Sequence, residues 1–189
     1  NINVDISSPA EHPTHFDSLS IRTDKIITAT NTKVQEILAF ECTPTIKNAR
    51  ITNGLTIVDS AVKLVNCSVT GLIELRFCDG YKQPILYLQN CTFKPTDVKV
   101  ITFSHEYLYG GENAKILEKN FDLDLIIVGL EPEQLSEIAP KINFFDRTSD
   151  SQVTKSTSQK VVLSKDGKGI HLASSSFDSN EAPETVPDK

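Results

Sequence analysis

The 189-residue chain contains no tryptophan and no methionine, and only 7% of its residues are aromatic. Its hydrophobic content of 39%, rich in isoleucine, valine, leucine and phenylalanine, is enough for one domain with a core. No apolar run approaches the roughly 18 residues that a membrane-spanning helix requires. The longest run, residues 125–130, has the length of a strand. We therefore expect no membrane span.

A cluster of positive charge is also missing. The 19 basic residues are scattered along the chain and are outnumbered by 25 acidic residues, which gives a net charge of −6. Phosphate backbones and anionic membranes attract basic patches. This charge balance argues against nucleic acid, and against an anionic membrane surface, as the main partner.

Motifs for catalysis, phosphate binding and metal binding are scarce. Residues 11–17 gather two histidines and two carboxylates, but a segment with a proline in it does not fix them around one metal ion. His105-Glu106 has no nucleophile or oxyanion loop to accompany it. Gly110-Gly111 lacks the following Lys-Ser/Thr of a phosphate loop. We expect a protein that is not an enzyme, with no catalytic residue, no cofactor and no metal site.

The chain does have a clear alternation of apolar and polar residues, most extended over residues 65–77. Such period-two alternation is typical of a strand with one buried face. Asp79-Gly80 supplies the conformation of a tight turn, and a second apolar run covers residues 85–93. Together these features predict one long β-hairpin over residues 65–93 as the core of the fold. The residues expected to face inward are Val69, Ile73, Leu75 and Phe77.

Shorter segments indicate further strands. Residues 46–51 and 55–58 flank Asn53-Gly54, which favours a second hairpin, and residues 98–103 and 121–128 also alternate. Residues 21–40 fit either strands or one helical face.

Helical signals are few. Pro132 at a first helical position, with Leu135 and Ile138 on one side, predicts a short closing helix. Residues 112–119 could form two more helical turns. The fold class predicted is therefore mainly β: an antiparallel β-sandwich or a partly open barrel with one or two short helices and a flexible C-terminal tail.

The predicted organisation has three parts. Residues 1–20 are expected to form an irregular lead-in, residues 21–146 the β domain, and residues 147–189 the tail. The tail contains 13 serine and threonine residues, carries no net charge and has few large apolar residues. Such a composition does not bury enough surface to offset chain entropy.

One segment of the tail, residues 161–172, has a hairpin sequence around Asp166-Gly167. An isolated hairpin is marginally stable in water, so it either stays disordered or adds to an exposed sheet edge, of its own domain or of a neighbour. An assembly subunit needs a contact that links one copy to the next, and we expect this hairpin to supply it. The candidate contact residues are Val161, Val162, Leu163, Ile170 and Leu172.

Four cysteines are present and none has C-x-x-C spacing, which argues against zinc-ribbon and thioredoxin chemistry. Cys67 and Cys91 are expected as cross-strand neighbours on opposite arms of the long hairpin. The thiols either pack as small buried hydrophobic groups or take part in a disulfide or an intermolecular cross-link. The candidates for such a link are Cys67, Cys91, Cys42 and Cys78.

Asn66-Cys67-Ser68 and Asn90-Cys91-Thr92 match the N-glycosylation sequon. Both are expected in the middle of strands rather than in loops. We therefore interpret them as chance matches.

Residues 45–51, followed by a strand over residues 69–77 and by Gln83-Pro84-Ile85 at the start of a return strand, form a recognisable pattern. Over residues 38–130 this pattern resembles the SPOCS-type domain of clostridial spore-coat and spore-morphogenesis proteins. Residues 123–130 fall where that family's terminal strand is expected. The LysM-like module that many such proteins carry is not seen, and the cysteines are not part of the pattern. The resemblance implies a non-enzymatic β domain that acts in spore-envelope assembly through protein contacts.

Two functions are therefore expected. The first is a structural and interaction protein, a subunit of a spore-surface or extracellular assembly, whose partners are its own copies or other envelope proteins. The alternative is a secreted binding module that recognises carbohydrate or a protein receptor. Four tyrosines either form an exposed patch for such a ligand or are half-buried strand residues. They are Tyr81, Tyr87, Tyr107 and Tyr109.

Overall fold

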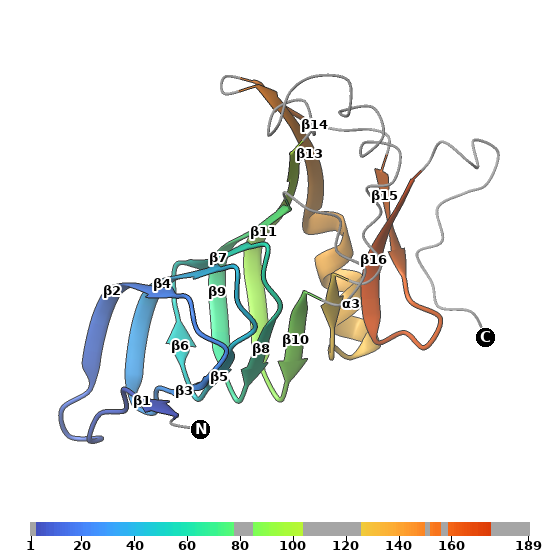
Figure 1. Cartoon of the computed structure of the whole chain (residues 1–189). Coiled ribbons are helices and arrows are strands. Elements are labelled where there is room, and N and C mark those ends of the chain that lie inside the picture. The colour runs from blue at the N-terminus through green and yellow to red at the C-terminus, as the bar shows by residue number, and fades with distance from the viewer. Residues whose placement is uncertain (1–2, 78–84, 104–125, 150–151, 156–158, 175–189) are drawn as a thin grey trace.

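The computed structural model describes residues 3–77, 85–103, 126–149, 152–155 and 159–174. Within these residues the protein is mainly β, with two large sheets and one short α-helix (Figure 1). The first sheet, sheet A, has the order β1 (Val4–Asp5), β3 (Ile26–Thr28), β5 (Thr45–Lys47), β8 (Val62–Val65), β10 (Leu86–Gln89), β12 (Ile127–Val128), β16 (Gly169–Ser174) and β15 (Gln159–Leu163). The second, sheet B, has the order β14 (Gln152–Lys155), β13 (Ile142–Ser149), β11 (Thr92–Phe103), β9 (Ser68–Phe77), β6 (Arg50–Ile51), β4 (Thr32–Phe40) and β2 (Thr14–Ile21), and β7 (Gly54–Val58) pairs with β4 and β9.

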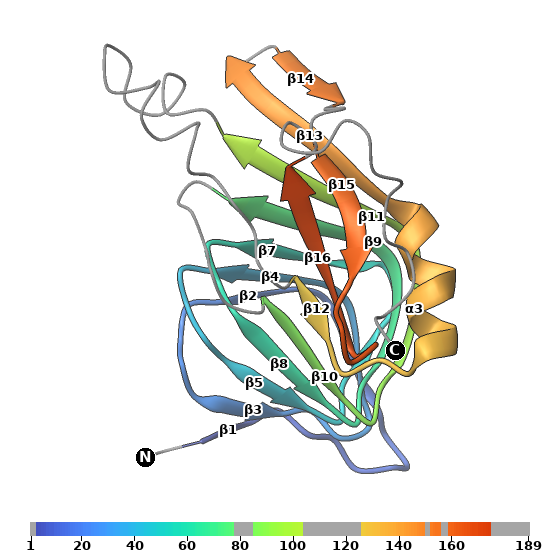
Figure 2. The ribbon, with the colours of Figure 1, turned by 90° about the vertical axis from the view of Figure 1, so that its right-hand side faces the viewer.

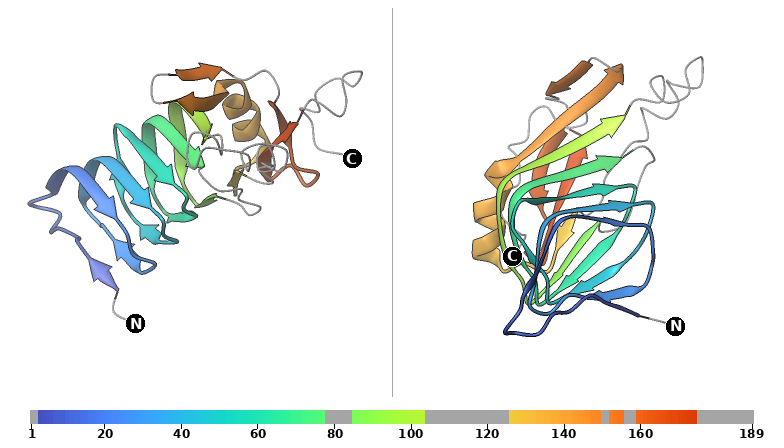
Figure 3. Two further views of the ribbon diagram at one scale, coloured as in Figure 1. Left: turned by 45° about the horizontal axis from the view of Figure 1, so that its top comes forward. Right: turned by 90° about the vertical axis from the view of Figure 1, so that its left-hand side faces the viewer.

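The chain coils so that each turn contributes strands to both sheets (Figure 3). Strands of successive turns pair in parallel, from β1 to β12 in sheet A and from β2 to β13 in sheet B. In the middle of the stack Ile46 pairs with Leu64 and Ile51 with Val69, so one turn spans 18 residues. The architecture is a parallel β-solenoid, in which each turn buries its apolar side chains against its neighbours.

The prediction of a mainly β protein is confirmed, but the prediction of antiparallel sheets is wrong. Antiparallel pairing occurs at β13–β14, β12–β16 and β15–β16, and the other described pairs are parallel. Side chains alternate between faces in both kinds of sheet, so alternation does not reveal strand direction.

The prediction of one long antiparallel hairpin over residues 65–93 is also wrong. β8 ends at Val65, the chain bends at Asn66, and β9 pairs in parallel with β11. Asp79-Gly80, the expected turn, lies outside the described residues. The face assignment is nevertheless confirmed, since the four residues expected to face inward are fully buried. They are Val69, Ile73, Leu75 and Phe77.

Asn53-Gly54 does not form a hairpin either, because β6 and β7 on its two sides both pair in parallel with β9. Gly54 has a φ of 119°, and a Cβ atom on it would lie 2.3 Å from the carbonyl oxygen of Leu72. The glycine is thus needed for the close approach of two successive turns rather than for a chain reversal.

Left-handed residues mark the corners between the sheets. Asn48, Asn66 and Asn90 have φ values of 63°, 56° and 53°, and they lie between the sheet A and sheet B strands of three successive turns. Asparagine tolerates this conformation better than most residues. The Nδ2 of Asn90 donates to the Oδ1 of Asn66 at 2.7 Å. Both sequon asparagines are therefore exposed at a corner and not in mid-strand as expected.

The predicted closing helix is confirmed as α3 (Pro132–Ile138), followed by a 3-10 turn (Ala139–Lys141). Glu131 and Gln134 form a capping box at its start, and Leu135 and Ile138 are buried. Residues 21–40, which fitted strand or helix, contain β3 and β4. Residues 112–119 and most of 121–128 lie outside the described part of the chain.

Regular structure extends into the predicted lead-in and tail. β1 and β2 begin within residues 1–20, and β14, β15 and β16 lie within residues 147–189. The hairpin around Asp166-Gly167 forms, with Leu163 paired to Ile170. β16 pairs with β12, so the hairpin adds to its own sheet (Figure 2).

Candidate functional site

In the described part of the chain, both sheets end in strands that pair on one side only. Among the described residues, β1 pairs with β3 alone and β2 with β4 alone at the N-terminal end. At the other end, within the part of the chain that the structure describes, β15 pairs with β16 alone and β14 with β13 alone. Edge strands present N–H and C=O groups that another strand can pair with. These edges are the first candidate site.

The hydrogen bonds of the hairpin show which groups of β15 point outward. Ser164 donates its N–H to the carbonyl of Gly169 at 2.7 Å, so residues 164 and 169 form a hydrogen-bonded pair. In an antiparallel ladder such pairs alternate with pairs that are not bonded to each other. Val162 therefore points its backbone groups toward β16, and Val161 and Leu163 point theirs away from it. The Ile170 carbonyl fits this pattern, since it accepts the N–H of Ile126 at 2.7 Å on the far side of β16.

The side chains predicted as assembly contacts lie mostly within the protein's own core. Leu163, Ile170 and Leu172 are buried, and Val161 and Val162 are half-buried. Their side chains stabilise the last turn of the solenoid. The part of the hairpin that faces outward along the edge is the backbone of β15.

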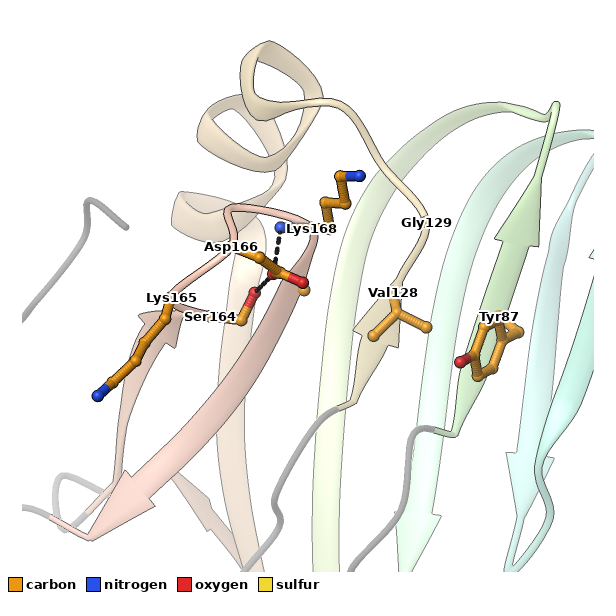
Figure 4. Close-up of a pocket in the computed structure, with 8 residues that line it drawn as sticks. Tyr87, Val128, Gly129, Ser164, Lys165, Asp166 and Lys168 are labelled. Atoms are coloured by element: carbon orange, nitrogen blue, oxygen red, sulfur yellow. Dashed lines mark hydrogen bonds between the residues drawn. The ribbon is translucent and has the colours of Figure 1, made fainter. Parts of the chain in front are cut away.

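A cleft of about 540 Å³ lies beside the tip of the same hairpin (Figure 4). Tyr87 of β10 lies on one side of it, with 49% of the residue exposed, and the turn that carries Asp166 and Lys168 lies on the other. Asp166 accepts the hydroxyl of Ser164 at 2.6 Å and the N–H of Lys168 at 2.9 Å. These hydrogen bonds hold the pKa of Asp166 below its usual range. The cleft thus combines an exposed aromatic ring with fixed polar groups.

Of the residues that line this cleft, the sequence indicated only Tyr87 as a candidate for ligand contact. Tyr87 was one of four tyrosines considered for an exposed patch, and the other three lie outside the described residues. Nothing in the spacing of Tyr87 and Asp166, which are far apart in the chain, indicates that they line one cleft. The connection depends on β12 and β16, which place the hairpin next to β10 in sheet A.

Cys67 and Cys91 are neighbours, as expected, but at aligned corners of successive turns rather than on antiparallel arms. The N–H of Cys67 donates to the Sγ of Cys91 at 3.4 Å. Cys42 lies at another corner, where its N–H donates to the Oγ of Ser60 at 3.0 Å. Cys78 lies outside the described residues. The three described cysteines are free thiols.

The other motifs considered for metal binding or catalysis do not add to these sites in the part of the chain that the structure describes. His15 and Asp17 approach each other at 3.9 Å on the exposed strand β2. In the part of the chain that the structure covers, no three potential metal ligands gather at one point. Helices there are also too short to cross a membrane. His105-Glu106 and Gly110-Gly111 fall outside that part.

Comparisons with protein-family models, with curated proteins and with solved structures found no match. The sheet edges and the cleft are therefore the features from which a function can be inferred.

Proposed function

We propose that this protein is a non-enzymatic structural and interaction protein, a subunit of a spore-surface or extracellular assembly. Its copies, or other envelope proteins, associate with it by adding a strand to the edge of a sheet. The observation that supports this most is the outward-pointing backbone of Val161 and Leu163 in β15, which pairs with β16 alone among the described strands. Strand addition needs such groups, and they are the source of its affinity.

The two ends of the solenoid also differ from each other, which favours a head-to-tail arrangement. One end presents β1 and β2, and the other presents β14 and β15. Contacts between unlike ends generate rings or open filaments rather than closed dimers. Such products suit a surface layer or an appendage. The resemblance to the SPOCS-type domain supplies the spore envelope as the setting and remains part of the proposal.

The experiment compares Val161→Pro with its matched control Val161→Ala. Proline removes the outward N–H of residue 161, and an edge strand accepts proline at a position whose N–H is not used in the ladder. Alanine truncates the side chain, which proline does not, but keeps the N–H, so it tests whether assembly depends on the valine side chain rather than on the backbone donor. We expect Val161→Ala to assemble like the unmodified protein and Val161→Pro to remain monomeric, as measured by size-exclusion chromatography with light scattering at matched concentrations.

Circular dichroism of both variants checks that they are folded. Equal assembly of folded Val161→Pro and Val161→Ala would contradict strand addition at β15, and an unmodified protein that stays monomeric at high concentration would contradict association between its own copies.

A second candidate function, recognition of a carbohydrate or of a protein receptor, is favoured by the cleft beside Tyr87. Ligand sites commonly combine an apolar or aromatic surface with a few placed polar groups. A glycan array screened with the unmodified protein and with Tyr87→Ala tests it. Glycan binding that Tyr87→Ala abolishes in a monomeric protein would favour this second function.

A further inference from the structure

Cys67 and Cys91 occupy equivalent positions in two successive turns of the solenoid. On one side of them Val65 pairs with Gln89, and on the other Ser68 pairs with Thr92, so the two cysteines are in register. Hydrogen bonds hold the chains together at this corner. Asn66 donates its N–H to the carbonyl of Gln89 at 2.9 Å, and Thr92 donates to the carbonyl of Cys67 at 3.0 Å.

This alignment brings the pair within reach of a covalent bond. Neighbouring strands of a sheet lie about 4.8 Å apart, and disulfides join residues whose Cα atoms are about 4.4–6.8 Å apart. The direct contact from the Cys67 N–H to the Cys91 Sγ, at 3.4 Å, confirms that the side chain of Cys91 lies over the backbone of Cys67.

The two thiols differ in exposure and in acidity. Cys67 is 3% exposed, whereas Cys91 is half-buried and reachable from solvent. Hydrogen bonds from the Cys67 thiol and from the Cys67 N–H lower the pKa of Cys91 to about 6. The same thiol contact, together with burial, raises the pKa of Cys67. Cys91 is therefore the more accessible and the more acidic thiol and Cys67 the buried one, the pattern of a reactive cysteine beside its partner.

We infer that Cys67 and Cys91 form a redox centre that low-molecular-weight disulfides such as glutathione disulfide convert into an intrachain disulfide. The Cys91 thiolate attacks one sulfur of glutathione disulfide, forms a mixed disulfide and releases one glutathione thiolate. The Cys67 sulfur then attacks the Cys91 sulfur of the mixed disulfide. Its proton passes to the departing glutathione thiolate, so that two glutathione molecules are released in total and the protein loses two hydrogen atoms. This inference is independent of the proposed function.

The chain offers conservative variants for a test. Ala49 occupies the aligned position in the preceding turn, where it is 2% exposed and its carbonyl accepts the N–H of Ser68 at 3.0 Å. The corner therefore accommodates alanine, and Cys67→Ala and Cys91→Ala are expected to fold. Cys42→Ser and Cys78→Ser in the background remove the other thiols.

The experiment incubates the reduced background protein with glutathione disulfide and follows the intact mass and the peptide map. We expect a product lighter by two hydrogen atoms, with Cys67 linked to Cys91, and a melting temperature raised by on the order of 10 °C, because the bond closes a long loop. Cys67→Ala is expected to stop at the mixed disulfide, and Cys91→Ala to react more than tenfold more slowly. A mixed disulfide that persists when both cysteines are present would overturn the inference, and so would a lack of reaction in a folded protein.

The pH dependence of alkylation gives a readout that does not depend on disulfide formation. Iodoacetamide should modify Cys91 with a midpoint near pH 6. In Cys67→Ala the thiol hydrogen bond is lost, and the midpoint should move toward the ordinary cysteine value of about 8.5. An identical midpoint in both proteins would show that Cys67 does not activate Cys91.

Discussion

The two ends of the solenoid differ in how completely their apolar side chains are buried. At the N-terminal end Ile21 of β2 is buried, but Ile6, Phe16 and Leu19 pack against the core and are only partly buried. At the other end α3 and the β15–β16 hairpin contribute five buried side chains to the same core. They are Leu135, Ile138, Leu163, Ile170 and Leu172. Each turn of a solenoid is stabilised by its neighbours, and at the C-terminal end α3 and the hairpin cover the last turn in place of a further one.

The burial of apolar side chains at an end of the solenoid and the pairing of its edge strand are separate properties. The hairpin completes the core at the C-terminal end, yet its outer strand still presents backbone groups along the edge. The N-terminal end, among the described strands, is open in both respects. A partner at the C-terminal end would therefore gain mainly backbone hydrogen bonds, and one at the N-terminal end would also cover apolar surface.

Substitutions in the interior of the stack are expected to destabilise the protein more than substitutions at either end. Ile73 is fully buried between the sheets, so Ile73→Asp places an unpaired charge in the core at a cost of several kcal/mol against a total stability of about 5–15 kcal/mol. We expect no folded protein. Leu72→Asp is the matched control, because Leu72 is 36% exposed on the opposite face of β9. Circular dichroism melts should show a folded Leu72→Asp protein; a folded Ile73→Asp protein with an unchanged melting temperature would refute the face assignment.

Two leucine truncations compare the ends directly. Leu172 is 2% exposed in the hairpin, so Leu172→Ala should reduce the free energy of unfolding by about 2–4 kcal/mol. Leu19 in β2 is half-buried, and Leu19→Ala should cost about 1 kcal/mol or less. Urea unfolding under conditions that keep the protein monomeric measures both. Equal losses would mean that the ends are equally well packed.

A smaller effect concerns the turn of the hairpin. The pKa of Asp166 is lowered by its bonds to the Ser164 hydroxyl and the Lys168 N–H, so the carboxylate stabilises the folded state at neutral pH. This contribution is present above the unfolded pKa of about 3.9 and is lost as the pH falls through the lower folded pKa. Asp166→Asn should therefore melt slightly below the unmodified protein at neutral pH, and the difference should vanish in strong acid. A difference that is independent of pH would rule out the charge as its cause.

The alternation of apolar and polar residues predicts the strands and their inward faces, but it does not predict which strands pair with one another. The burial of Val69, Ile73, Leu75 and Phe77 follows from alternation, which holds whatever the strand direction. Asn53-Gly54 looked like a reversal because the same dipeptide serves tight turns and, as here, the close approach of two turns.

A signal for the solenoid was nevertheless present in the sequence. Asn48-Ala49 and Asn66-Cys67 recur 18 residues apart, and Asn90-Cys91 follows in the next turn, each pair leading into a sheet B strand. Internal repeats of this length indicate stacked turns. The cleft was not predictable in the same way, since it depends on where the hairpin docks, and that is set by pairing over long sequence distances.

The most direct test of the proposed assembly is hydrogen–deuterium exchange of single amides in the unmodified protein at low and at high concentration. We expect the amide of Val162, which is bonded within the hairpin, to be protected under both conditions. The outward amides of Val161 and Leu163 should exchange quickly in the dilute protein and become protected when it assembles. Assembly that leaves these two amides unprotected would contradict strand addition at β15.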